Sequence, residues 1–179
     1  MNDKNNICLI GYMGSGKTTV GRLVSERLGL NFTDTDRMIT EREARSIPDI
    51  FEKDGEAYFR QLEAGLVREL AGDAEFRNTV ISTGGGIVLS AENRAGLKRL
   101  GTVIYLRARA DSLYERVKND TGRPLLKTED IAGRIKEMLK ERSPMYEEAA
   151  DIIIDTDELD AEETAAALTG ILYPENTAG

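Results

Sequence analysis

Short runs of apolar residues alternate with longer amphipathic stretches along most of this chain. Five of the runs have the length and composition of buried strands, at 7–10, 30–33, 79–82, 102–106 and 151–155. Between the runs, apolar residues recur at intervals of three and four, which is the period of a helix with one buried face. Strands that alternate with helices predict an α/β fold, in which a five-stranded parallel sheet carries helices on both faces.

The helical stretches begin and end at residues that favour such boundaries. Gly29 follows the first amphipathic stretch, and Ser46-Ile47-Pro48-Asp49 has the cap, the proline and the acid of a helix start. We expect a short helix from there to Gly55 and a long helix that opens at Glu56. Further helices are expected near 37–45, 91–100, 111–118 and 130–149, and around Leu168. Because the chain has no repeat, linker or low-complexity block, we expect residues 1–179 to form a single domain.

The first apolar run leads into the helix through Gly11-Tyr12-Met13-Gly14-Ser15-Gly16-Lys17-Thr18. This segment fits G-x-x-x-x-G-K-[ST], the phosphate-binding P-loop, and it has the strand and helix that the motif needs. The glycines let successive N–H groups turn toward one anion at the positive end of a helix dipole. Lys17 is then expected at the β- and γ-phosphates and the Thr18 hydroxyl on Mg²⁺. A glycine-rich turn that matches by chance is the alternative, and the flanking elements argue against it.

Composition narrows the class of protein. The 179 residues carry a net charge of −8, which argues against a general nucleic-acid or anionic-membrane surface. The sequence has no histidine, and its single cysteine is Cys8. An internal disulfide and a histidine-based acid or base are therefore excluded, and a zinc site is disfavoured. With no apolar run of membrane-helix length and no signal-peptide core, we expect a cytoplasmic protein.

Two carboxylates follow the second apolar run, in Asp34-Thr35-Asp36. Residues two apart in an extended segment project to the same side, so we expect both carboxylates to face one way. At the carboxyl end of a parallel strand beside a P-loop, that direction is the phosphate crevice. The alternative is a solvated turn that caps a helix beginning near Arg37. The neighbouring P-loop favours the functional interpretation.

A second glycine segment, Gly84-Gly85-Gly86, follows the third apolar run and would emerge at the same edge of the sheet. Three consecutive glycines indicate a close approach of the backbone to another group or positive φ angles, with a flexible turn as the alternative.

Arg60 lies beside the apolar stripe of the long helix, not opposite it. A surface ion pair with Glu56 or Glu63 is a rival interpretation of this arginine.

Residues 119–130 are polar, contain Gly122, Arg123 and Pro124, and show no periodicity. This composition predicts a mobile lid that closes over the nucleotide.

The remaining motifs limit what is done with the nucleotide. A signalling GTPase needs N-K-x-D after its fourth strand, and Val117-Lys118-Asn119-Asp120 does not fit. A motor or transporter ATPase has a long apolar strand that ends in an acid, whereas the third run ends in Ser82-Thr83-Gly84. A small phosphotransferase remains, with an acceptor site built from the second strand, the Arg60 helix and the triple glycine.

Taken together, these motifs resemble those of the shikimate kinases over about residues 7–155. The resemblance rests on the order and spacing of Gly11–Thr19, Asp34-Thr35-Asp36, Gly55-Glu56-x-x-Phe59-Arg60-x-x-Glu63, Gly84-Gly85-Gly86, Arg123-Pro124-Leu125-Leu126 and Arg142-x-x-x-Tyr146. It implies a P-loop NTPase three-layer sandwich of the nucleoside-monophosphate-kinase type, with a lid. It also implies Mg-ATP-dependent phosphorylation of the shikimate 3-hydroxyl, in the pathway to chorismate and the aromatic amino acids.

The resemblance further implies roles for residues at matching positions. The residues implied for ATP are Gly14, Ser15, Gly16, Lys17, Thr18, Thr19, Arg116 and Arg123. Mg²⁺ would be bound by Thr18, with help from Asp34 through water. The implied catalytic residues are Lys17, Asp36 and Arg123, with Asp36 acting as a base or orienting the acceptor hydroxyl. The residues implied for shikimate are Asp36, Arg60, Gly84, Gly85, Gly86 and Arg142, with Phe51, Phe59 and Glu63 lining or bracing the pocket.

One position departs from the family pattern, which usually has glycine where this chain has Ala44. Alanine would be strained there if the position required positive φ.

A gluconate or nucleoside-monophosphate kinase of the same fold is a rival interpretation, but the separated Arg60 and Arg142 suit one carboxylate better than a second phosphate. A nucleotide-binding regulator that has lost catalysis is another. We expect a monomer that binds shikimate as a small-molecule substrate and has no nucleic-acid or membrane partner.

Overall fold

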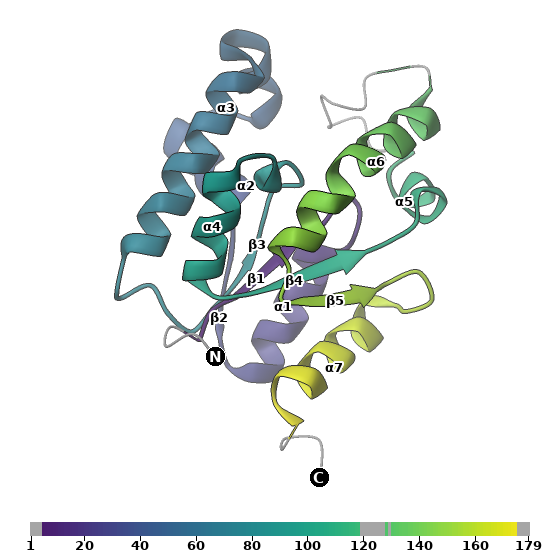
Figure 1. Cartoon of the computed structure of the whole chain (residues 1–179). Helices are drawn as coiled ribbons and strands as arrows, with labels where there is room; N and C mark the ends of the chain where they lie inside the picture. The colour runs from purple at the N-terminus through teal and green to yellow at the C-terminus, as the bar shows by residue number, and fades with distance from the viewer. Residues whose placement is uncertain (1–4, 119–127, 129, 175–179) are drawn as a thin grey trace.

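The computed structural model of the protein describes residues 5–118, 128 and 130–174, and in this part of the chain five strands form one sheet. The strands are β1 (Ile7–Ile10), β2 (Asn31–Asp34), β3 (Thr79–Ser82), β4 (Thr102–Arg107) and β5 (Ile152–Asp155). All neighbouring strands run parallel, in the order β2-β3-β1-β4-β5, with β1 in the middle (Figure 1). The predicted parallel α/β fold is confirmed.

Helices occupy the predicted stretches, with small shifts at their ends. They are α1 (Lys17–Leu28), α2 (Thr35–Glu43), α3 (Ile47–Gly72), α4 (Ala91–Leu100), α5 (Ala110–Val117), α6 (Ile131–Ala149) and α7 (Ala161–Leu172). A 3-10 turn, η1 (Ile87–Leu89), follows the triple glycine. None of the helices in the described ranges is long and apolar enough to cross a membrane.

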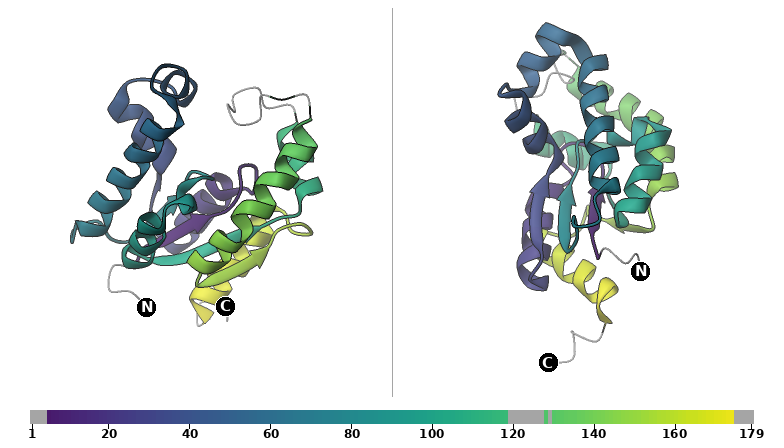
Figure 2. Two further views of the ribbon diagram at one scale, coloured as in Figure 1. Left: turned by 45° about the horizontal axis from the view of Figure 1, so that its top comes forward. Right: turned by 90° about the vertical axis from the view of Figure 1, so that its left-hand side faces the viewer.

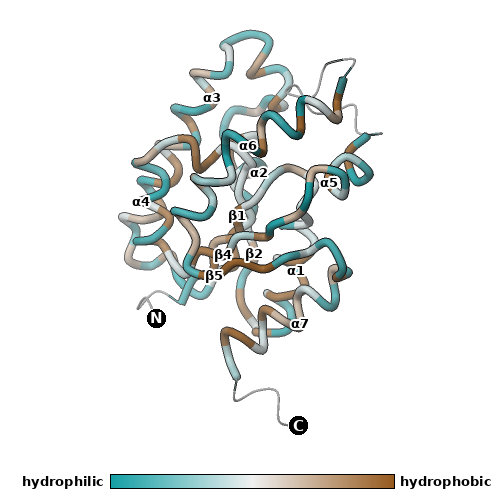
Figure 3. The backbone as a smooth tube through the Cα atoms, turned by 45° about the vertical axis from the view of Figure 1, so that its right-hand side comes forward, coloured by the Kyte–Doolittle hydropathy of each residue, from teal (hydrophilic) through white to brown (hydrophobic). Residues whose placement is uncertain are grey.

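The central strand is apolar throughout because its alternate residues enter two separate cores. Ile7 and Leu9 pack with side chains of α1 and α7, whereas Cys8 and Ile10 pack with side chains of α3, α4 and α6. In Figure 1, α1 and α7 lie below the sheet and α3, α4 and α6 lie above it. The chain is therefore layered helix, sheet, helix, and hydrophobic residues concentrate in the strands (Figure 3).

Two boundaries differ from the prediction for identifiable reasons. Strand β2 begins at Asn31, since the Leu30 amide donates to Ser25 O in the turn that ends α1. Helix α2 ends at Glu43, and the next residue, Ala44, has φ 50° and ψ 32°. The positive φ considered for Ala44 is therefore present, in the left-handed region that favours glycine.

The α3 segment consists of two helices joined at a sharp break. Ser46 begins the first by accepting a hydrogen bond from the Asp49 amide, and Gly55 interrupts it with φ 83° and ψ 170°. The predicted short helix, Gly55 stop and long helix are therefore confirmed. Figure 2 shows that α3 and α6 extend beyond the sheet on opposite sides of the molecule.

Candidate active site

The P-loop joins β1 to α1 in the strand–loop–helix order predicted for it. Gly11, Gly14 and Gly16 have positive φ angles of 148°, 81° and 92°, so the loop uses its glycines for backbone shape. A Cβ atom at Gly11 would also lie 2.7 Å from Leu106 O of the neighbouring strand β4. The loop is thereby fixed against the sheet, at the positive end of the α1 dipole.

Lys17 is buried in the curl of this loop. Its Nζ donates hydrogen bonds to the backbone oxygens of Gly11, at 2.8 Å, and Tyr12, at 2.9 Å. The ammonium group is thus held by two carbonyl dipoles of the loop. A buried cation in this position attracts the charged oxygens of a nucleotide polyphosphate.

The Thr18 hydroxyl lies between two acceptors at the carboxyl edge of the sheet. It donates to Asp34 Oδ2 at 3.0 Å and lies 3.1 Å from Ser82 Oγ. Two hydroxyls and a carboxylate form an all-oxygen set, which is the chemistry that Mg²⁺ prefers. Within the described residues no three or more Asp, Glu, His or Cys side chains cluster as a metal cage. The set therefore suits a cation that keeps waters and phosphate oxygens as its other ligands.

The two predicted carboxylates reach the site by a different route from the one expected. The prediction that both project from one extended segment is wrong, because β2 ends at Asp34 and Asp36 lies in the first turn of α2. Asp34 Oδ1 accepts hydrogen bonds from the amides of Asp36 and Arg37, and so caps α2 while its other oxygen binds Thr18. Asp34 therefore caps α2 and also contacts Thr18, so the capping role does not exclude a role in the site.

A cavity of about 450 Å³ lies over the P-loop. It is lined by Met13, Gly14, Gly16, Lys17, Thr18, Thr19, Asp34, Asp36, Ser82, Thr83, Gly85 and Arg116. A second hollow of about 230 Å³ continues past Arg116 to the segment that follows β5. The pair of cavities gives room for a polyphosphate beside the loop and for a flat group beyond it.

Arg116 separates the two hollows and braces their walls. Its Nη2 donates to Thr156 O at 2.9 Å, while Nη1 lies 3.5 Å from Gly14 O. The arginine therefore ties the segment after β5 to the tip of the P-loop. Its guanidinium plane offers a stacking surface for a nucleotide base.

The triple glycine lies between the 450 Å³ cavity over the P-loop, called the phosphate cavity from here on, and a group of charged side chains. A Cβ atom on Gly84 would lie 2.6 Å from Asp36 Oδ1 and 2.8 Å from Glu63 Oε1, and one on Gly86 would overlap the Arg60 guanidinium. Neither Gly84 nor Gly86 has positive φ. Glycine is therefore needed at these positions because other side chains approach the backbone closely, and not because of the backbone conformation. Asp36 lines the phosphate cavity and also faces this second group.

Arg60 makes both of the ion pairs considered for it. Its Nη1 donates to Glu63 at 2.6 Å and its Nη2 to Glu56 at 2.7 Å. The pair with Glu63 is no surface contact, because the Glu63 side chain is 0% exposed. Burial raises the pKa of Glu63 to about 7 and the Asp36 charge adds to the rise, while Arg60 and Arg142 oppose it.

Arg142 enters the same region from α6 and is buried. Its Nη1 lies 3.5 Å from Gly85 O, and its Nε has no hydrogen-bond partner among the described residues. One turn later, Tyr146 stacks on Tyr105 of β4 and donates a hydrogen bond to Gly85 O. Arg142 is thus held by a rigid helix against the glycine loop, with donor capacity left for an anion.

The structure brings together the predicted residues that it describes, in two adjoining groups. Those at the phosphate cavity are Gly14, Ser15, Gly16, Lys17, Thr18, Thr19, Asp34, Asp36 and Arg116, and those around the triple glycine are Gly84, Gly85, Gly86, Arg60, Glu63 and Arg142. Phe51 and Phe59 pack together beside Arg60, with ring centres 5.2 Å apart. Arg123 and most of the predicted lid lie outside the described residues.

Sequence reasoning assigned no role to several polar groups of the site. Ser82 contacts the Thr18 hydroxyl, and the Thr35 hydroxyl accepts a hydrogen bond of 3.1 Å from the Gly84 amide. Thr156 binds Arg116. Each of the three lies at the carboxyl end of a parallel strand or directly after it, and that position was the available signal.

Comparison with known proteins gives one consistent result. A family model described as shikimate kinase matches residues 13–172. A shikimate kinase of Nitrosococcus oceani is 50% identical over 84% of this chain and 78% of its own length, and one of Legionella pneumophila is 44% identical over 95% of both. A solved structure of a shikimate kinase from Acinetobacter baumannii, in complex with shikimate, superposes with a TM-score of 0.90 at 37% identity. That comparison covers 99% of this chain and 97% of the other.

Proposed function

The chain belongs to the shikimate kinase family, and from that premise we propose that it transfers the γ-phosphate of ATP to the 3-hydroxyl of shikimate. The observation that carries the proposal is the double position of Asp36. This carboxylate lines the cavity over the P-loop and also lies against Gly84, in the glycine segment that Arg60 and Arg142 approach. A hydroxyl that contacts Asp36 would therefore meet a phosphate bound at Lys17.

For the nucleotide, we propose that the P-loop amides and Lys17 bind the β- and γ-phosphates and that the adenine extends past Arg116. The 230 Å³ hollow beyond Arg116 supports this assignment. Thr18 and Asp34 would hold Mg²⁺, since their oxygens and Ser82 Oγ form a compact all-oxygen set. When bound, the ion neutralises charge that develops on the phosphate oxygens.

For the acceptor, we propose that Arg60 and Arg142 bind the carboxylate of shikimate and that the triple glycine lies along its ring. Guanidinium groups match a carboxylate because they donate two parallel hydrogen bonds. Phe51, Phe59 and Glu63 would line or brace this pocket. A nucleoside monophosphate fits this site less well, because a second phosphate would need more arginines than the separated pair of Arg60 and Arg142 provides. Gluconate also carries one carboxylate, so the choice between gluconate and shikimate rests on the assay below.

In the proposed reaction, the acceptor hydroxyl oxygen forms a bond to the γ-phosphorus and the bond to the bridging oxygen of ADP breaks. The hydroxyl proton passes to Asp36, or to the product phosphate if Asp36 only orients the hydroxyl. Phosphoryl transfer depends mostly on positioning and on charge neutralisation, so Lys17 is expected to matter at least as much as Asp36. Arg123, which lies outside the described residues, is assigned to the closing lid by family resemblance.

We further propose that residues 1–179 act as a single-domain monomer in the cytoplasm, without nucleic-acid or membrane partners. The net charge of −8 and the absence of a membrane-length apolar run in the sequence support the exclusion of nucleic-acid and membrane partners.

Release of ADP from Mg-ATP, measured with shikimate, gluconate, AMP or CMP as acceptor, tests the proposal. We expect turnover that depends on shikimate and that is lost in a Lys17→Met variant purified in parallel. Turnover with another acceptor alone would retain the phosphate site and reject the acceptor assignment. No turnover with any acceptor, together with tight ATP binding, would favour a regulator that has lost catalysis.

A further inference from the structure

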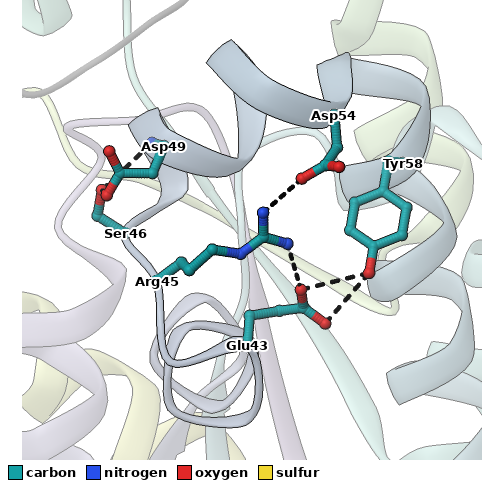
Figure 4. Close-up of polar contacts among 6 residues, drawn as sticks. All are labelled: Glu43, Arg45, Ser46, Asp49, Asp54 and Tyr58. Carbon is teal, nitrogen blue, oxygen red and sulfur yellow. Dashed lines mark hydrogen bonds and ion pairs between the residues drawn. The ribbon is translucent and has the colours of Figure 1, made fainter.

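A compact polar cluster lies outside the candidate site, where α2 meets α3. Arg45 donates to Asp54 Oδ2 at 2.5 Å through Nη1 and to Glu43 Oε2 at 2.6 Å through Nη2. The Tyr58 hydroxyl donates to the same Glu43 carboxylate, at 3.3 Å. Figure 4 shows the Arg45 guanidinium lying between the two carboxylates, with Tyr58 on the far side of Glu43. We call these four residues the Arg45 clasp.

The clasp spans both breaks that isolate the short helix 47–54 from its neighbours. One break is Ala44, in the left-handed region, and the other is Gly55, with φ 83° and ψ 170°. Glu43 precedes the first break, Asp54 ends the short helix, and Tyr58 follows the second break. The cluster therefore links three backbone segments that are separated by the non-helical residues Ala44 and Gly55.

The charged groups of the clasp are partly shielded from water. The Arg45, Glu43 and Asp54 side chains are 29%, 19% and 37% exposed, whereas those of the neighbouring pair Arg42 and Glu69 are 47% and 56% exposed. An isolated exposed pair contributes little to structure, but a shielded network with several partners fixes geometry better. Hydrogen bonds to both carboxylates raise the pKa of Arg45, in agreement with this arrangement.

The short helix packs against the residues next to Arg60, which is one of the two arginines proposed to bind the acceptor. Ile50 is completely buried, and Phe51 packs on Phe59 with ring centres 5.2 Å apart. The Arg60 guanidinium lies 5.4 Å from the centre of the Phe59 ring. A movement of the short helix would therefore change the position of Phe51 relative to Phe59 and Arg60.

We propose that the Arg45 clasp positions the wall of the acceptor pocket, and that Arg45 thereby raises affinity for shikimate without contacting it. This inference rests on the proposed function. A residue that acts only on pocket shape contributes to binding more than to the chemical step, so its loss raises KM and leaves kcat nearly unchanged. No residue of the clasp lines the phosphate cavity, so KM for ATP should stay unchanged.

Steady-state kinetics of Arg45→Gln, with both substrates varied, test the proposal. We expect KM for shikimate to rise roughly five- to tenfold, the size expected when one or two net hydrogen bonds are lost. KM for ATP should stay the same and kcat should stay within about twofold. Arg42→Gln is the matched control, because it removes an ion pair from α2 to α3 without touching the short helix. Arg45→Lys, which keeps the charge but not the fork, should restore part of the affinity.

A structural measurement tests the role of the clasp independently of the kinetics. Hydrogen exchange of amides 46–55 should speed up in Arg45→Gln and not in Arg42→Gln. Tyr58→Phe removes one hydroxyl from the clasp and should raise KM for shikimate about two- to threefold. If Arg45→Gln does not fold, Tyr58→Phe and Asp54→Asn decide the matter by the same criterion.

An unchanged KM for shikimate in these variants, or an equal rise in Arg42→Gln, would overturn the proposal. If the wild-type protein turns over another acceptor instead, the proposed function fails, and the same comparison is made with that acceptor. If the wild type turns over no acceptor, unaltered exchange of amides 46–55 in Arg45→Gln overturns the clasp and faster exchange supports it.

Discussion

Arg60 donates a hydrogen bond of 2.6 Å to Glu63, and the Glu63 side chain is completely buried where the two meet. Glu63 Oε2 is thus satisfied, while Oε1 faces the triple glycine without a hydrogen-bond partner among the described residues. Burial raises the pKa of Glu63 from 4.5 to about 7, although Arg60 opposes the rise. A group with this environment binds its proton more tightly in the folded protein than in the unfolded chain.

The first prediction follows from that difference in proton binding. Between pH 4.5 and pH 7 the folded state holds more protons at Glu63, so the stability that Glu63 contributes falls as the pH rises. The wild type should lose about 3 kcal/mol relative to Glu63→Gln across this range, with little further change above it. Urea unfolding of both proteins at several pH values measures the difference, and Gln keeps an acceptor for Arg60.

Glu69→Gln is the control for this series, because the hydrogen bond from Arg42 lowers the pKa of Glu69. Its contribution to stability should be lost as the pH falls, which is the opposite sign. A difference between wild type and Glu63→Gln that does not depend on pH would show that Glu63 is ionised in the folded protein well below pH 7.

The second prediction concerns Gly86, whose backbone has φ −98° and tolerates a side chain. A Cβ atom there would overlap the Arg60 guanidinium, so Gly86→Ala should displace this arginine from the pocket. Loss of a charged hydrogen bond predicts a rise of about tenfold or more in KM for shikimate. In Gly65→Ala, where the added Cβ meets nothing within 4 Å, KM should stay normal and stability should rise by about 1 kcal/mol. A normal KM in Gly86→Ala would remove Arg60 from the acceptor site.

The third prediction tests Asp36, which lies between the phosphate cavity and the acceptor pocket. Asp36→Asn should lower kcat by about 100-fold or more, whether the carboxylate accepts the proton or only orients the hydroxyl. ATP binding, followed by calorimetry, should be retained. Asp111→Asn, at an exposed acid that also lies in the first turn of a helix, serves as the control. Near-normal turnover by Asp36→Asn would exclude Asp36 from the mechanism.

The sequence was sufficient to predict most of the fold because local and long-range requirements agree in it. Strand β1 is apolar at every position since both of its faces are buried, and a run of this kind is visible without a structure. Gly55 could be recognised as a break because it follows a well-formed helix start at Ser46.

The site was less predictable where the spacing of residues in the sequence is compatible with two different local structures. Asp34 and Asp36 are two residues apart, as neighbours on one side of a strand would be, but α2 begins between them. Both carboxylates line the phosphate cavity, although not from one extended segment as the spacing predicted. Arg60 likewise has the spacing of an ion pair on a helix surface. Only the packing of Glu63 against the triple glycine makes that pair a buried one, and sequence spacing alone does not report burial.

The last prediction concerns Ala44, whose left-handed conformation at the end of α2 is one that glycine adopts without strain. Alanine costs roughly 1–2 kcal/mol there, while glycine adds about 0.4–1 kcal/mol of unfolded-state entropy. Ala44→Gly should therefore stabilise the protein by roughly 0.5–1 kcal/mol, measured by urea unfolding. Ala166→Gly, at an exposed position inside α7, should destabilise by about 1 kcal/mol, since there only the cost of glycine applies. Equal destabilisation in both variants would mean that Ala44 is held in its conformation by contacts that outweigh the strain.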